Sequence, residues 1–160
     1  MRAFHVFARM RPERAREVLS ALREKAPGVY TQAVAAASAA MRARPRFLVA
    51  QPEEKRAELV RRTLSRVAAA ELAEEVLAAY FLEVRRDLLV EWLDAVGVAH
   101  EAGTLKGADP PPPSREKLDA ALASFRKEAD RADRELLLEA FAAQSAVDWP
   151  ELEAALPPSA

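Results

Sequence analysis

The sequence of 160 residues has no cysteine, isoleucine or asparagine, and it has only four glycines. Without cysteine, the chain cannot form a disulfide framework, a thiolate nucleophile or a zinc site with cysteine ligands. Valine and threonine together supply 16 residues. This small number argues against a β-sandwich, a β-barrel or a large parallel sheet, because sheets favour β-branched and aromatic residues. Four glycines are also too few for the tight turns of a nucleotide-binding α/β protein.

The chain also lacks long apolar runs. No segment approaches the roughly 20 apolar residues that a membrane-spanning helix requires. Charged residues interrupt the opening stretch, MRAFHVFARMRP, so this stretch does not contain the apolar core of a signal peptide. We therefore expect a soluble cytoplasmic protein that does not bind a membrane.

Helix-forming residues are abundant, with 36 alanines, 19 leucines and 19 arginines. Apolar residues recur every three or four positions, as at Ala15, Val18, Leu19 and Leu22, which is the spacing of one face of an α-helix. The sequence therefore predicts an all-α fold without a significant sheet. We expect a compact multi-helix bundle or an irregular array of helical hairpins, with about seven or eight helices.

Several helix boundaries follow from residues with special backbone preferences. The stretch 53–96 contains neither glycine nor proline, but a single helix of that length would be too long for a compact domain. We therefore expect breaks near Ala68–Glu71 and Arg85–Asp87. Asp87 is expected to cap the helix after the second break, and Gly97 is expected to end that helix in a left-handed conformation.

Residues 98–113 are the longest irregular stretch, and they include the proline run Pro110–Pro113. We expect one helical domain over residues 1–160, in which this loop separates a larger N-terminal part from a smaller C-terminal part. Ser114 is a good N-cap for the next helix, and Asp148–Glu151 resembles a capping box.

The large apolar side chains also have expected places. Phe47–Val49 is a short apolar link between two predicted helices. Trp92 falls on a strongly apolar helix face, which indicates a core position, and Trp149 is expected at the seam where the last helix docks.

Charge is unevenly distributed along the chain, although the net charge is only −1. Residues 1–80 carry 15 Lys and Arg against 9 Glu, a balance of +6, whereas residues 81–160 carry 9 Lys and Arg against 16 Asp and Glu, a balance of −7. A basic half favours acidic partners or phosphates. GC-rich coding is the alternative explanation, because arginine outnumbers lysine 19 to 5.

Six arginines are the candidate contacts for phosphates or for an acidic partner. Three surround Pro45 and three lie on the helix that follows: Arg42, Arg44, Arg46, Arg61, Arg62 and Arg66. If that helix packs beside the Pro45 corner, the six form a positive patch whose binding depends on salt and little on nucleotide sequence. Arginines near helix ends also interact with the helix dipole or with glutamates, so a structural role is the alternative.

His100 and Glu101 in the loop are the candidate residues for a metal ion or a proton shuttle. A metal site would need two or three further ligands, and the sequence does not point to them. The nucleophile elbow, the glycine-rich phosphate loop and the Glu-x-x-His pair of di-metal bundles are all missing. We therefore expect no cofactor and favour a non-enzymatic role.

These observations favour a protein–protein interaction or self-association module, with a protein partner or a second copy of the chain as its ligand. A nucleic-acid-binding protein that uses the basic first half is the alternative. A small-ligand binder or enzyme near His100 is the third hypothesis. An apolar or arginine-rich patch that stays exposed after the core is buried would mark the interaction site.

Overall fold

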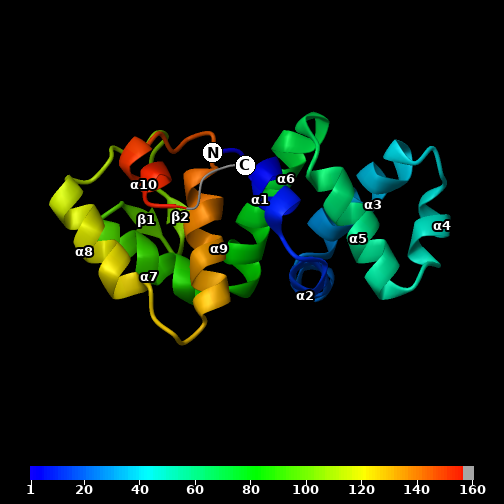
Figure 1. The fold of residues 1–160 in the computed structure, drawn as a ribbon, viewed down its shortest axis with the longest axis horizontal. Helices are drawn as coiled ribbons and strands as arrows, with labels where there is room; N and C mark the ends of the chain where they lie inside the picture. The colour runs from blue at the N-terminus through cyan, green and yellow to red at the C-terminus, as the bar shows by residue number, and fades with distance from the viewer. Residues whose placement is uncertain (157–160) are drawn as a thin grey trace. The chain divides into compact units, whose positions relative to one another are not determined.

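Helices joined by short turns make up most of the computed structural model, which describes residues 1–156 (Figure 1). The α-helices of these residues are α1 (Ala3–Arg9), α2 (Pro12–Lys25), α3 (Pro27–Ala40), α4 (Pro45–Val49), α5 (Glu53–Leu64), α6 (Ala70–Ala79), α7 (Arg86–Val96), α8 (Arg115–Phe125), α9 (Arg131–Ala142) and α10 (Pro150–Ala154). A 3₁₀ turn, η1 (Val67–Ala69), precedes α6, and a π-helical turn, η2 (Tyr80–Val84), follows it. The predicted all-α fold is confirmed. None of the described helices is both long and apolar enough to cross a membrane.

The described helices number ten rather than the expected seven or eight, and two of them have only five residues. One of these two is α4, which occupies the segment that the sequence predicts to be an apolar link. Pro45 stands at its first position, where a fixed φ favours the helix and no backbone N–H is needed. Leu48 is fully buried and holds this single turn on its neighbours. Five residues are too few for an apolar periodicity, so the pattern could not reveal this helix.

The chain divides into two compact units, residues 2–84 and residues 85–156 together with Met1. The division falls directly after the π-helical turn and not in the 98–113 loop. The expectation of one domain over residues 1–160 stays a prediction.

In residues 2–84, the core lies among α1, α2, α3, α5 and α6. Ala15, Val18 and Leu22 of α2 are fully buried, as their helical spacing predicts. Ala33 and Ala37 of α3 are also fully buried. Their small side chains let α3 pack closely on its neighbours, beside larger core side chains such as Phe7, Leu19 and Phe81.

The expected breaks in the stretch 53–96 are confirmed. The chain leaves α5 at Leu64 and re-enters a helix at Ala70, and it breaks again at Arg85. The predicted capping role of Asp87 is wrong, because Arg85 occupies the N-cap position and makes no side-chain cap bond. The Asp87 carboxylate instead accepts two hydrogen bonds from the Arg85 guanidinium, each of 3.2 Å.

An aromatic cluster fills the core of residues 85–156. The centroid of the Trp92 ring lies 5.3 Å from that of Phe125 and 6.1 Å from that of Phe141. The ring centroids of Phe141 and Trp149 are 5.1 Å apart. The core position predicted for Trp92 is confirmed. Trp149 is also buried, and its indole N–H donates to the carbonyl oxygen of Pro110 at 2.9 Å. This bond ties the proline run to the segment that leads into α10.

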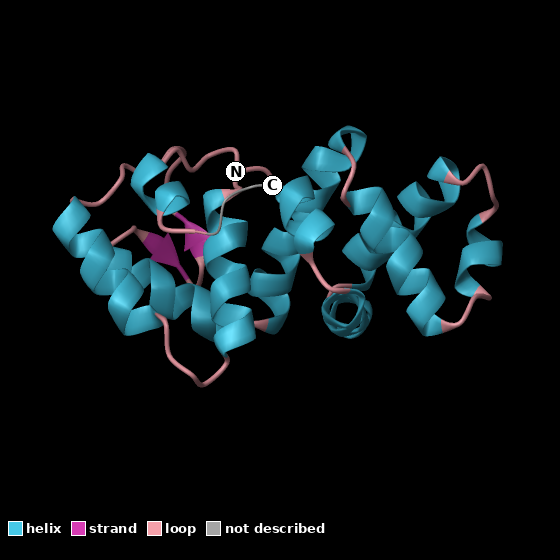
Figure 2. Ribbon diagram, viewed as in Figure 1, coloured by secondary structure: helices cyan, strands magenta, loops and turns pink. Residues whose placement is uncertain are grey.

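The 98–113 loop contains a short hairpin of two strands of two residues each, which the sequence does not predict. Figure 2 shows its two strands in magenta, β1 (His100–Glu101) and β2 (Thr104–Leu105), which pair antiparallel. Gly97 ends α7 with a left-handed φ of 75°, as predicted, and the Ser114 hydroxyl accepts the Lys117 N–H, as an N-cap does. The predicted capping box is wrong, because Trp149 rather than Asp148 is the N-cap of α10.

The left-handed Gly97 generates a stability prediction. Gly97→Ala should lower the free energy of unfolding by about 1 kcal/mol, because a Cβ atom disfavours the left-handed conformation. The added methyl group also meets the Lys117 side chain. Urea denaturation of the variant and the wild type measures the change.

Gly28→Ala is the matched control. Gly28 lies in α3 without a positive φ, and a Cβ atom there meets nothing within 4 Å. This second substitution should therefore raise stability by about 0.5–1 kcal/mol through reduced backbone freedom of the unfolded chain. A loss of stability in Gly28→Ala equal to that in Gly97→Ala would contradict the account.

Candidate interaction surface

Three of the six candidate arginines lie close together in the sequence, and no carboxylate of the described residues pairs with them. Arg42, Arg44 and Arg46 are all exposed. Within residues 1–156, their side chains make no hydrogen bond and no ion pair. Their guanidinium groups are therefore available to a ligand.

Exposed apolar side chains gather in the same segment. Among the described residues, the large hydrophobic side chains that stay exposed are Met41 at 40%, Phe47 at 51%, Val49 at 59% and Val67 at 72%. Three of these four lie within residues 41–49. We define the corner surface by six residues of this segment: Met41, Arg42, Arg44, Arg46, Phe47 and Val49.

The local backbone explains why these side chains point outward. Arg42 takes a left-handed φ of 53°, which ends α3, and the Ala43 N–H donates to the Ser38 carbonyl oxygen at 2.9 Å. In α4, Leu48 points into the core. Since successive helical residues are about 100° apart, Phe47 and Val49 flank Leu48 on either side. Arg46 lies nearly opposite Leu48 and so faces away from the core.

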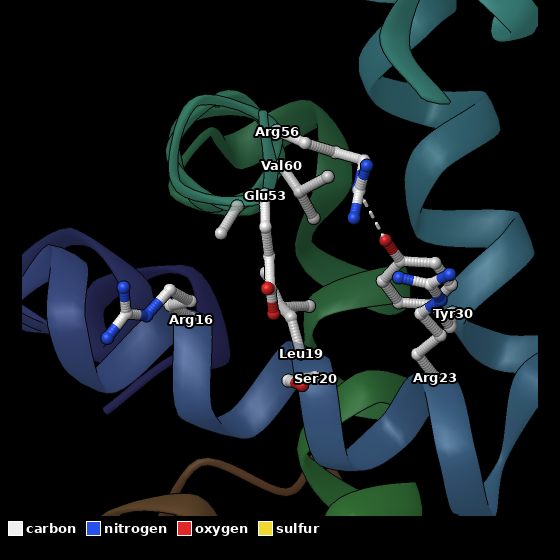
Figure 3. A pocket seen from close by; sticks show the side chains of 9 residues that line it. Arg16, Leu19, Ser20, Arg23, Tyr30, Glu53, Arg56 and Val60 are labelled. Carbon is white, nitrogen blue, oxygen red and sulfur yellow. Dashed lines mark hydrogen bonds between the residues drawn. The ribbon is translucent and has the colours of Figure 1, made fainter. Parts of the chain in front are cut away.

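A buried arginine, Arg56, holds residues 49–51 against α3 and α5 through hydrogen bonds; we call this arrangement the clamp. Only 9% of Arg56 is exposed. Its Nε donates to the Tyr30 hydroxyl at 2.8 Å, and its Nη1 donates to the carbonyl oxygens of Val49 and Gln51 at 3.0 and 3.1 Å. Figure 3 shows the bond from Arg56 on α5 to Tyr30 on α3. This one side chain of α5 is therefore bonded to α3, to the last residue of α4 and to the turn between α4 and α5.

The cavity beside this clamp is too small for a substrate. It is lined by charged and apolar side chains of α2, α3 and α5, among them Arg16, Arg23 and Glu53 (Figure 3). Its volume is about 10 Å³, which is room for about one water molecule. The Arg56 hydrogen bonds therefore have a structural role, and the cavity beside them does not form a substrate site.

The other candidate arginines are placed differently. The Arg61 guanidinium donates to both Glu58 carboxylate oxygens at 2.7 and 2.9 Å, and to the Phe7 carbonyl oxygen at 3.1 Å. Arg62 donates to the same carboxylate at 2.7 Å. Hydrogen bonds from Arg61, assisted by those from Arg62, lower the pKa of Glu58 to about 2. Arg61 and Arg62 therefore balance the half-buried carboxylate of Glu58.

Arg66 is exposed but does not join the corner surface. It follows the C-terminal end of α5, whereas the corner surface lies near the N-terminal end of that helix. Helix α5 extends for about 18 Å at 1.5 Å per residue. The structure thus brings together three of the six candidate arginines and separates them from the other three.

His100 and Glu101 lie in strand β1. His100 Nε2 is 2.9 Å from an Asp94 carboxylate oxygen, and its Nδ1 accepts the Gly103 N–H at 3.1 Å. Nε2 therefore ties the hairpin to α7 and Nδ1 braces the turn of the hairpin, while Glu101 is exposed. No group of three potential metal ligands occurs in the described part of the chain.

A second hollow in residues 2–84 was not predicted. This open groove of about 390 Å³ lies between the start of α3 and the end of α6, and its floor consists mainly of small apolar residues. Lys25, Glu75 and Glu83 are the charged residues along it. The small residues Gly28, Ala78 and Ala79 are the sequence signal, but alanine is so frequent in this chain that they do not stand out.

Comparisons with known proteins give no relative from which to transfer a role. No protein-family model, curated protein or solved structure matches the chain.

The Glu58 cluster generates a pH prediction. Because the pKa of Glu58 in the folded state lies near 2, below its unfolded value, the ionised carboxylate stabilises the fold above about pH 4.5. That stabilisation disappears as the pH falls through about 2. Glu58→Gln should cost about 1 kcal/mol at neutral pH, and this difference from the wild type should shrink between about pH 5 and pH 2.

Urea denaturation at several pH values measures the difference, and Glu24→Gln is its control. Glu24 is exposed on α2 and makes no ion pair within the described residues. A pH-independent cost of Glu58→Gln, parallel to the Glu24→Gln profile, would argue against the arginine cluster as the source of the shift.

Proposed function

We propose that the protein is a non-enzymatic interaction module that binds another protein through its corner surface. The observation that supports this proposal is the concentration of exposed Met41, Phe47 and Val49 in one nine-residue segment. Exposed apolar residues that gather in one place and are rimmed by polar residues are typical of protein–protein contact sites. Burial of such groups by a partner supplies the favourable free energy of binding.

The side-chain types favour a protein ligand over a nucleic acid. Nucleic-acid sites combine many phosphate contacts with stacking aromatic rings. Arg61 and Arg62 already pair with Glu58, so two of the six candidate arginines are not available to phosphates. Met41 and Val49 are aliphatic and gain more from contact with apolar side chains than from contact with bases.

Charge argues against self-association through this face. A symmetric dimer places the same patch of both copies together. Three uncompensated arginines from each copy would then face one another, and like charges in an interface are costly. A small-ligand site or an active site near His100 has less support, since both ring nitrogens already hold the hairpin.

The test is a selection from a random dodecapeptide library displayed on phage, with the whole protein as the target. Val49→Ser and Val67→Ser form the matched pair, because each removes an exposed valine from a different place in residues 2–84. Peptides selected on the wild type should bind Val67→Ser equally well. They should bind Val49→Ser about tenfold more weakly, because an apolar contact of the size of a valine side chain is lost.

Two results would contradict the proposal. One is a library that yields no peptide with a preference for the wild type over Val49→Ser. The other is salt-sensitive binding of a mixed-sequence oligonucleotide that is abolished by Arg46→Gln, in the absence of any selected peptide. That second result would instead favour the nucleic-acid hypothesis.

A further inference from the structure

The corner surface carries charge of one sign only. No aspartate or glutamate occurs between residues 26 and 52, a stretch that includes all of α3 and α4. The next carboxylates along the chain are Glu53 and Glu54. Glu54 accepts a hydrogen bond from Arg16 at 2.9 Å, and Glu53 lines the small cavity behind the clamp. The counter-charge for Arg42, Arg44 and Arg46 must therefore come from outside these elements.

The three arginines lie between the exposed apolar residues along the chain. Going along the chain, Met41 is followed by Arg42, and Arg46 is followed by Phe47. Around α4, the Arg46 side chain lies between the directions of Phe47 and Val49, on the side away from the core. A ligand that covers the apolar groups therefore meets guanidinium groups within the same contact. Guanidinium groups pair with carboxylates, as they do with phosphates, through two parallel hydrogen bonds.

The buried clamp keeps part of this arrangement fixed before a ligand arrives. Arg56 bonds directly to the backbone oxygen of Val49, one of the exposed apolar residues. A preformed surface loses less conformational freedom on binding than a mobile loop does. The corner surface is thus suited to a short segment of complementary shape.

We infer that the corner surface binds an acidic amphipathic segment of a partner protein. Carboxylates of that segment pair with Arg42, Arg44 and Arg46, while its apolar side chains cover Met41, Phe47 and Val49. This inference rests on the proposed function and names the chemistry of its partner. Anionic lipid surfaces and nucleic acids also carry negative charge, but exposed apolar side chains next to guanidinium groups fit a peptide with side chains of both kinds.

The first test is the composition of the peptides selected on the whole protein. They should be enriched in Asp and Glu together with Leu, Phe or Trp, relative to the unselected library. The strongest peptide is then synthesised in two versions, as selected and with every Asp and Glu replaced by the corresponding amide. Fluorescence anisotropy should show that the acidic version binds about tenfold more tightly or better, with a difference that narrows as salt is added.

Two triple variants locate the charge effect. The corner variant combines Arg42→Gln, Arg44→Gln and Arg46→Gln. The control variant combines Arg2→Gln, Arg11→Gln and Arg66→Gln, which remove the same charge from exposed arginines whose side chains have no bond within residues 1–156. The corner variant should lose about tenfold or more in affinity for the acidic peptide, and the control variant should stay within about twofold of the wild type.

The possible failures are distinguishable. One failure is a set of selected peptides whose binding depends on Val49 but which contain no excess of acidic residues. Another is a selected peptide that binds equally well when its Asp and Glu residues are replaced by amides. Either result would overturn this inference and leave the proposed function intact. An equal loss in the two triple variants would also overturn it, by showing a non-local charge effect. Binding to phosphatidylserine vesicles or to an oligonucleotide, without any Val49-dependent peptide, would overturn both the inference and the proposed function.

Discussion

The buried guanidinium of Arg56 is the constraint on which the organisation of the corner surface depends. Burying a cation is costly unless oxygen atoms replace its water. Here the replacements are the Tyr30 hydroxyl and the carbonyl oxygens of Val49 and Gln51. These oxygens come from α3 and from both sides of the turn between α4 and α5. Because all of them must face one planar group, these elements are held together, and the short helix α4 has a defined position despite its five residues.

Arginine in this protein serves three different purposes, and only one of them points to a partner. Arg56 donates hydrogen bonds to backbone carbonyl oxygens outside the regular helical pattern. Arg134 does the same, and it also donates to the Glu91 carboxylate at 2.9 Å. Arg61 neutralises Glu58 at the surface. Arginines of the third kind, such as Arg46, have no bond within the described residues. A high arginine content is therefore not itself a sign of nucleic-acid binding. The informative quantity is the charge that remains after internal pairing.

The sequence was sufficient for features that depend on local pattern. Helix faces, the two breaks around α6 and the left-handed Gly97 follow from apolar spacing and backbone preference. It was not sufficient for Asp87, whose carboxylate pairs with Arg85 rather than capping the helix, because a cap depends on the dihedral angles of the residue before the helix. It also placed Arg42 and Arg61 in one patch, although only one of them is uncompensated. The pairing of Arg61 and Arg62 with Glu58 follows the i, i+3 and i, i+4 spacing of one helix, so this part of the outcome was readable from the sequence.

Hydrogen exchange of the arginine side chains, followed by ¹⁵N NMR, tests the central claim most directly. The claim is that one arginine is locked inside the fold while those of the corner surface remain available. The account predicts that the Nε–H of Arg56, assigned by its disappearance in Arg56→Lys, exchanges with water far more slowly than the Nε–H groups of Arg42, Arg44 and Arg46. Exchange of Arg56 at the same rate as these three would contradict the clamp, and with it the preformed surface.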